Sequence, residues 1–266
     1  MVELKGVSVA YPLPRGGTAQ AVKGANAVFA EGGFSAIIGP SGCGKTSLLR
    51  TIAALVAPSE GEVLIGGSTL RGVRGRTAVI FQDYCLLPWK TVFANAELPL
   101  RLGANTARGG SRKAGREKVE SLLAEFGLAQ FAKRYPSQLS GGMKQRVAIV
   151  RALAAEPELL LMDEPFSSLD ALSREDAQDF VLSVQRERRL TVVMVTHSIE
   201  EAAYLADSVY VMGGSNPGAI TAHIEIRRDE SQPRAGFRGN PRFHEYCSAL
   251  RGALAEGSGA KGGKPG

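Results

Sequence analysis

A glycine-rich loop between an apolar strand and a helix constrains this chain more than any other feature. Residues 39–46 read GPSGCGKT and fit the pattern G-x-x-x-x-G-K-[ST] without a mismatch. The apolar residues 34–38 predict a buried strand before it, and apolar spacing from Leu48 to Val56 predicts a helix that Pro58 stops. Glycines let backbone N–H groups turn onto a phosphate, and a helix N-terminus adds partial positive charge. The sequence therefore predicts a phosphate-binding loop.

The chemistry of this loop assigns roles to its polar side chains. Lys45 can reach the β- and γ-phosphates of a nucleotide, and the Thr46 hydroxyl can bind Mg²⁺. An ordinary glycine-rich turn is the alternative, and the flanking strand and helix disfavour it. The residues expected to bind nucleotide here are Gly39, Pro40, Ser41, Gly42, Cys43, Gly44, Lys45, Thr46 and Ser47.

A second segment, residues 139–145, also has the shape of an anion-binding helix start. Ser140 stands where an N-cap belongs, and Gly141 and Gly142 expose backbone N–H groups. Taken alone, a plain capped helix that Pro157 ends explains these residues better. Two phosphate-facing segments in one chain nevertheless suggest a nucleotide held between two copies of the protein.

An acidic pair follows a third informative segment. Residues 159–162 are apolar without a polar break, as in a central parallel strand. Asp163 and Glu164 follow at its carboxyl end, where open α/β sheets place their ligands. One carboxylate can hold Mg²⁺ and the other can orient or deprotonate an attacking water. Two solvated loop carboxylates are the alternative.

Together these segments resemble the ATP-binding subunit of ABC transporters. Residues 39–46 match the Walker A motif of that family, residues 139–145 its signature, and residues 159–164 its Walker B motif. The resemblance implies ATP and Mg²⁺ as ligands, Glu164 as the catalytic carboxylate and Asp163 as a metal ligand. It further implies roles for five residues: Gln82 (Q-loop, catalysis and metal), His197 (catalytic switch), Tyr11 (stacking on adenine), and Asp170 (D-loop) and Gln145 (signature), both at the nucleotide.

Two positions depart from the family pattern. Ser198 follows His197 where many relatives carry Asp, and the signature has Lys144 where Gln or Arg is common. Neither change removes a group expected to touch the phosphates, so we expect an active enzyme.

The implied fold class is α/β: a P-loop NTPase (RecA-like) parallel-sheet core with an antiparallel β subdomain and an inserted α-helical subdomain. We expect an ATPase domain over residues 1–226, with the helical subdomain at about 83–155. A C-terminal extension over residues 227–251 and a disordered tail over 252–266 would follow, because the tail has little apolar content. The Gly/Arg/Ser-rich stretch at 103–115 predicts a mobile loop.

The segment at residues 82–100 bears on the partner. It contains the only tryptophan, Trp89, and several apolar side chains in a stretch interrupted by prolines. Its sequence is similar to that of the ATP-binding subunits of importers for nitrate, taurine and other alkyl sulfonates. In those importers this region contacts the membrane permease. The resemblance implies a permease partner, a second copy of this chain and, indirectly, a solute-binding protein. Burial in the helical subdomain is the alternative, favoured for Val92 and Leu98.

Composition agrees with an ATPase docked on a membrane. The 266 residues are 44% hydrophobic, yet no run reaches the roughly 18 apolar residues of a membrane span, and no N-terminal signal is visible. We therefore expect a peripheral protein on the cytoplasmic face of the cell (inner) membrane. The net charge is +6, but no aromatic residues alternate with the basic side chains that produce it. A platform on which bases could stack is therefore poorly supported, and nucleic acid is not expected as a partner. A soluble ABC ATPase acting on nucleic acid, ribosomes or cofactor assembly is the alternative function.

Overall fold

The computed structural model describes residues 1–14, 16–102, 112–214, 217–228 and 234–257. The chain divides into two compact units, one made of Met1–Val73 with Val184–Gly266 and the other of Arg74–Ser183. This second unit covers more residues than the predicted helical subdomain, because it also contains two strands that pair in parallel.

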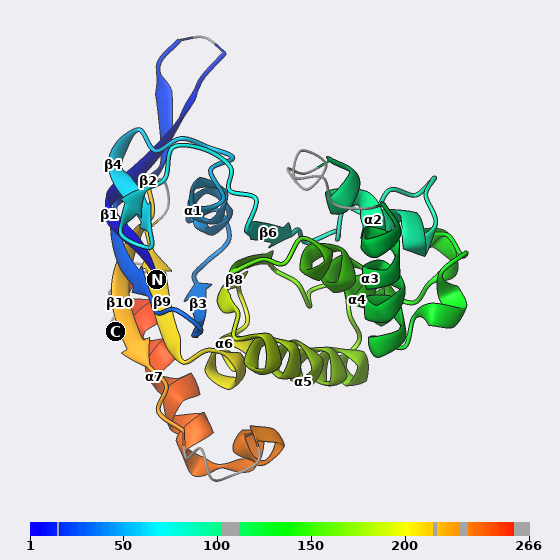
Figure 1. Cartoon of the computed structure of the whole chain (residues 1–266). Coiled ribbons are helices and arrows are strands. Elements are labelled where there is room, and N and C mark those ends of the chain that lie inside the picture. The colour runs from blue at the N-terminus through cyan, green and yellow to red at the C-terminus, as the bar shows by residue number, and fades with distance from the viewer. Residues whose placement is uncertain (15, 103–111, 215–216, 229–233, 258–266) are drawn as a thin grey trace. The chain divides into compact units, whose positions relative to one another are not determined.

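The first unit contains an antiparallel sheet built on a long hairpin (Figure 1). The hairpin strands β1 (Val2–Pro12) and β2 (Thr18–Phe29) pair from Val2↔Phe29 to Pro12↔Thr18. On the other side of β1, β4 (Glu60–Ile65) pairs antiparallel, and the short β5 (Ser68–Thr69) completes the order β2-β1-β4-β5. The antiparallel β subdomain of the predicted fold is therefore present.

A mainly parallel set of strands in the same unit carries the phosphate loop. The central strand β3 (Phe34–Ile38) pairs parallel with β8 (Thr191–Thr196) on one side and with β9 (Ser208–Gly213) on the other. The last strand, β10 (Ala219–Glu225), pairs antiparallel with β9. Every residue of β3 and β8 is buried, which explains why their sequences lack alternation.

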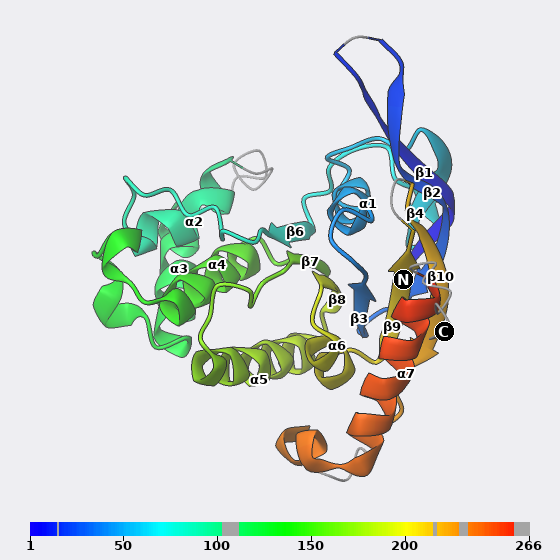
Figure 2. The same cartoon turned by 180° about the vertical axis from the view of Figure 1, so that it is seen from behind.

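Two helices of the first unit begin at the loops of functional interest. Helix α1 (Lys45–Ile52) follows the phosphate loop, and α6 (Ile199–Leu205) follows β8. A 3₁₀ turn, η3 (Arg234–Gly239), leads into α7 (Pro241–Gly257), which lies along β9 and β10 (Figure 2).

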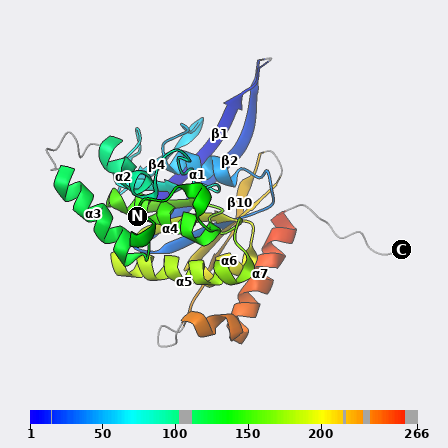
Figure 3. The same ribbon diagram turned by 90° about the vertical axis from the view of Figure 1, so that its right-hand side faces the viewer.

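The second unit is mostly helical. Helices α2 (Val92–Leu102), α3 (Arg112–Glu125) and α4 (Gly141–Ala154) pack on one another (Figure 3), joined by the turns η1 (Ala129–Phe131) and η2 (Pro136–Gln138). Strands β6 (Thr77–Ile80) and β7 (Leu159–Asp163) pair parallel, and α5 (Ala171–Arg188) begins after them.

Three sequence-based boundaries are wrong. Helix α1 ends at Ile52 rather than near Val56, because Ala54 takes a left-handed φ of 58° and Leu55 N–H bonds back to Arg50 O. Helix α3 includes residues 112–115 of the predicted loop, and residues 103–111 lie outside the described part. Helix α7 continues to Gly257, so residues 252–257 of the predicted tail are helical; residues 258–266 lie outside the described part.

Candidate functional site

The phosphate loop joins β3 to α1 with a backbone that only glycine adopts easily. Gly42 and Gly44 have φ values of 81° and 92°. The Lys45 side chain is buried, and its Nζ donates hydrogen bonds to Gly39 O at 2.8 Å and Pro40 O at 2.9 Å. A cation thus sits over a turn of backbone at a helix N-terminus, an arrangement suited to an anion with several oxygens.

Cys43 faces into the protein rather than toward the open side of the loop. Its side chain is fully buried, and burial raises the pKa of the thiol although nearby Lys45 acts in the opposite direction. Alkylation needs an accessible thiolate. The thiol is therefore protected, and only the backbone of Cys43 remains a candidate for phosphate contact.

Tyr11 is tied to the start of α1. Its hydroxyl donates a hydrogen bond to Ser47 Oγ at 3.1 Å, which holds the half-buried side chain beside the phosphate loop. Its stacking on adenine stays a prediction.

His197 lies exposed in a firmly braced turn between β8 and α6. The buried Thr196 hydroxyl donates to Glu201 Oε2 at 2.7 Å, and Ser198 N–H donates to Thr196 Oγ1 at 3.0 Å. Ser198 also caps α6, because its Oγ accepts from Glu201 N–H at 3.2 Å. Ser198 thereby supplies the cap that Asp would supply at this position.

In the second unit, the acidic pair stands at the end of β7 as predicted. Asp163 is the last residue of this fully buried strand and is itself 7% exposed. Glu164 has a φ of 45°, in the left-handed region that non-glycine residues rarely adopt. Such strain, of order 1–3 kcal/mol, persists where surrounding structure imposes it and is concentrated at functional sites.

The backbone just after Glu164 is held by two distant side chains. Pro165 O accepts a hydrogen bond from Tyr84 Oη at 3.1 Å and another from Gln145 Nε2 at 3.3 Å. Tyr84 Oη also lies 3.1 Å from Ser168 Oγ. We call these four residues the Pro165 hub: Tyr84, Gln145, Pro165 and Ser168. The hub joins the segment after Gln82, the signature helix and the loop after β7.

The signature segment begins a helix as predicted. Ser140 Oγ accepts from Met143 N–H at 3.3 Å and caps α4. A Cβ at Gly141 would lie 3.0 Å from Leu169 Cδ2, whereas one at Gly142 would meet nothing within 4 Å. Gln145 is 1% exposed and bound within the hub, so burial disfavours its predicted nucleotide contact, which stays untested.

The segment after Gln82 is strained and clamped. Gln82 is exposed, and Tyr84 and Cys85 have φ values of 60° and 44°. The Arg151 guanidinium, from the last turn of α4, donates to Tyr84 O at 2.5 Å and to Cys85 O at 2.6 Å. These two bonds satisfy the carbonyls of the strained pair.

Trp89 does not belong to the core. Its side chain is 70% exposed, which overturns burial as the explanation for this residue. Val92 is fully buried as favoured, while Leu98 is half-buried on α2, a helix that continues through Pro99. The buried Asn95 shapes the turn before α2, since its amide bonds Leu87 N–H at 2.7 Å and the Leu87, Lys90 and Thr91 carbonyls.

Asp170 caps α5. Its Oδ1 accepts from Ser173 N–H at 3.0 Å, and this bond lowers the pKa of the carboxyl. A sequence-level signal existed, since Asp before a helix is a preferred N-cap. The predicted role of Asp170 at the nucleotide stays a prediction.

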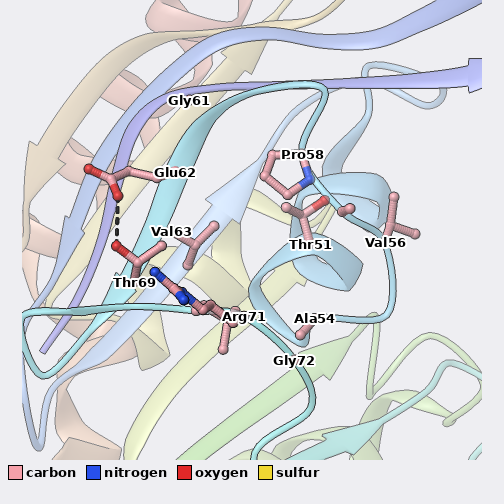
Figure 4. Close-up of a pocket in the computed structure, with 12 residues that line it drawn as sticks. Thr51, Ala54, Val56, Pro58, Gly61, Glu62, Val63, Thr69, Arg71 and Gly72 are labelled. Atoms are coloured by element: carbon pink, nitrogen blue, oxygen red, sulfur yellow. Dashed lines mark hydrogen bonds between the residues drawn. The ribbon is translucent and has the colours of Figure 1, made fainter.

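A pocket in the first unit lies at the opposite end of α1 from the phosphate loop (Figure 4). Thr51, Ala54, Pro58, Glu62, Thr69 and Arg71 are among its lining residues. The Thr69 hydroxyl donates to Glu62 Oε2 at 2.8 Å across one wall. None of the predicted site residues lines it, so we do not assign it to the nucleotide.

Two features are absent from the described residues. No helix there is long and apolar enough to cross a bilayer. No group of three or more His, Cys, Asp or Glu side chains there is arranged to hold a metal ion.

Comparisons with known proteins bear on these assignments. The family model described as "ABC transporter" matches residues 22–167. A taurine import ATP-binding protein of Pseudomonas entomophila is 39% identical, with 92% of this chain and 93% of the relative covered. A nitrate import ATP-binding protein of Synechocystis is 38% identical, with 90% and 91% covered. A solved dimeric ATP-binding cassette bound to ADP and Pi is 33% identical with a TM-score of 0.72, covering 86% of this chain and 100% of that one.

These matches confirm three predictions made from the sequence. The P-loop NTPase fold class, with its parallel core and antiparallel sheet, agrees with the solved cassette. The ATP-binding, ATP-hydrolysing class agrees with the family, and the resemblance to the nitrate and taurine subgroup agrees with the named relatives. The chain therefore belongs to the ABC transporter family.

Proposed function

We propose that this chain is the ATP-hydrolysing subunit of an ABC importer for a small anionic solute such as nitrate, taurine or an alkyl sulfonate. The observation that carries the proposal is the complete phosphate loop, with buried Lys45 over it, in a chain similar along its length to nitrate and taurine import subunits. None of the relatives reported above is named for a role on nucleic acid, ribosomes or cofactor assembly.

The phosphate loop suits a nucleotide, and we expect Mg²⁺ beside the bound phosphates. Lys45 Nζ already binds two oxygens, Gly39 O and Pro40 O, and phosphate oxygens can take their place. Mg²⁺ prefers oxygen ligands and is usually held by one or two carboxylates together with substrate phosphates. We assign the ion three oxygen ligands of this kind, from the Thr46 hydroxyl, the Asp163 carboxylate and the Gln82 amide. When bound, the ion neutralises charge that develops on the phosphates.

In the proposed reaction, water attacks the γ-phosphate in line, the bond from the γ-phosphorus to the β–γ bridging oxygen breaks, and ADP leaves. Lys45 holds the phosphates, and Glu164 orients the water and accepts its proton. The left-handed backbone of Glu164 supports this assignment, because strain of this kind accompanies function. His197 and Gln82 sense the γ-phosphate, and Tyr11 stacks on the adenine.

We infer that a second copy of the chain completes the site. Ser140, Gly141 and Gly142 of one copy would cover the γ-phosphate bound by the other, with Asp170 at the same interface. Backbone N–H groups at the start of α4 supply the positive end of a helix. The solved relative is described as a dimer, which supports this arrangement.

We assign residues 82–100 to contact with a polytopic membrane permease, which would hold this chain peripherally at the cytoplasmic face of the inner membrane. Trp89 is the exposed aromatic anchor of this segment, and such residues often dominate interface energies. We expect Trp89→Ala to lose co-purification with the permease encoded beside this chain, while melting temperature and ATPase activity of the isolated subunit change little.

Leu55→Ala is the matched control, because Leu55 is also exposed, at 50%, but lies outside the segment. Retained co-purification by Trp89→Ala would remove this segment from the permease interface. Co-purification of the wild-type chain with nucleic acid or ribosomes in place of a membrane protein would overturn the importer assignment itself.

A further inference from the structure

Gly218, the last residue before β10, packs directly against the phosphate loop. Gly218 is so close to the backbone of Cys43 that a Cβ at residue 218 would overlap Cys43 O and lie 2.9 Å from Cys43 C. Gly218 is buried, and no residue with a side chain fits there unless the phosphate loop moves.

The same glycine is fixed in place by β2. Gly218 N–H donates to Ala21 O at 3.1 Å, and Lys23 N–H donates to Gly218 O at 2.9 Å, which forms a parallel bridge between Val22 and Gly218. This stretch of β2 also touches the phosphate loop, since a Cβ at Gly44 would lie 2.5 Å from Ala21 O. Gly218 therefore packs between β2 and the phosphate loop.

The C-terminal helix contacts the end of β9. Gly214 N–H donates to Gly257 O at 2.9 Å, and a Cβ at Gly213 would lie 2.5 Å from the same oxygen. The adjacent Met212 O faces the phosphate loop from β9, because a Cβ at Gly39 would lie 2.6 Å from it. The last turn of α7 thus connects through Gly213 and Gly214 to the backbone that supports the phosphate loop.

We propose that Gly218 is a positioning residue for ATP binding, and that the C-terminal end of α7, through Gly257, supports the phosphate loop separately by way of Gly213, Gly214 and the adjacent Met212. The proposal rests on the proposed function, in that ATP is taken to bind at residues 39–46. Phosphate recognition depends on backbone N–H groups at fixed positions. In catalysis, a misplacement of about 1 Å can lower the rate roughly 100-fold, which shows how strongly function depends on such positions. A displaced Cys43 backbone would therefore weaken nucleotide binding without any change in a phosphate-binding side chain.

Two glycine substitutions and one matched control test this role in the full chain. We expect Gly218→Ala to raise the Kd for a fluorescent ATP analogue at least about tenfold, and Gly213→Ala to raise it by a smaller factor. Gly252→Ala is the control on α7, because a Cβ there meets nothing within 4 Å; its Kd should match the wild type.

Labelling of Cys43 provides a readout that is independent of nucleotide. Cys43 is fully buried, so displacement of the phosphate loop should speed its reaction with N-ethylmaleimide, measured by mass spectrometry of the Cys43 peptide. We expect faster Cys43 labelling in Gly218→Ala and unchanged labelling in Gly252→Ala.

A folded Gly218→Ala with wild-type Kd and wild-type Cys43 labelling would overturn the proposal. Should Gly218→Ala fail to fold, Gly213→Ala decides by the same two measurements. A wild-type chain that does not bind the analogue would refute the proposed function instead, and the labelling result would still report whether Gly218 positions the loop.

Discussion

Removal of the Tyr84 hydroxyl tests the Pro165 hub. Tyr84 is 4% exposed and its hydroxyl lies 3.1 Å from both Pro165 O and Ser168 Oγ. A net hydrogen bond contributes about 0.5–1.5 kcal/mol, so Tyr84→Phe should lower the free energy of unfolding by about 1–2 kcal/mol. The loss stays modest because Gln145 still donates to Pro165 O.

The combination with Gln145→Met separates the hub from ordinary packing. Without both donors, the Pro165 carbonyl loses both of its hydrogen bonds from the hub, which costs about 1–3 kcal/mol beyond the bonds themselves. The double variant should therefore lose more stability than the sum of the singles, with a coupling of about 0.5–3 kcal/mol.

Urea unfolding followed by circular dichroism measures all four members of this cycle. Tyr135→Phe is the matched control, since Tyr135 is 45% exposed and its loss of hydroxyl should change stability by less than about 0.5 kcal/mol. Additive losses, or a Tyr84→Phe effect no larger than that of the control, would refute the hub.

Two further predictions concern Cys85 and the signature. Partial burial of the Cys85 thiol and, after it, the neighbouring Asp83 carboxylate raise the pKa of this thiol to about 11. Its maleimide labelling should therefore rise about tenfold per pH unit through pH 9, and Asp83→Asn should speed the labelling at pH 8. A labelling rate that levels off near pH 8.5 would contradict this. Gly142→Asp should leave ATP binding by the single subunit intact, because a side chain at this position meets nothing within its own chain. It should abolish ATP-induced dimers in gel filtration, because a carboxylate there repels the γ-phosphate bound by the partner. Loss of ATP affinity in the single subunit would instead assign Gly142 to the site of its own chain.

Local sequence signals predicted the parts of the site that local interactions build. The phosphate loop, the Ser140 cap and the buried β7 depend on residues within a few positions of one another, and the structure has all three. The end of α1 was missed because Ala54 takes a conformation for which Ala gives no signal. The helical end of α7 was missed because the low apolar content of this stretch suggested a tail.

The contacts that brace the site could not be predicted from the sequence. Tyr84 meets Pro165 across 81 positions, and Gly218 meets Cys43 across an even longer stretch of chain. No periodicity or motif encodes such a pair, because tertiary packing alone brings the two together. The placement of Gln145 illustrates the same limit: its position in the signature suggested the nucleotide, whereas its side chain bonds Pro165.

The central claim is ATP hydrolysis with Glu164 as the catalytic base, and steady-state turnover by Glu164→Gln measures it most directly. The variant keeps the size of the side chain, so ATP affinity should match the wild type while turnover falls roughly 100- to 10,000-fold. Glu187→Gln, an exposed position on α5, is the control and should hydrolyse ATP normally. Near wild-type turnover by Glu164→Gln, with ATP still bound, would contradict the account.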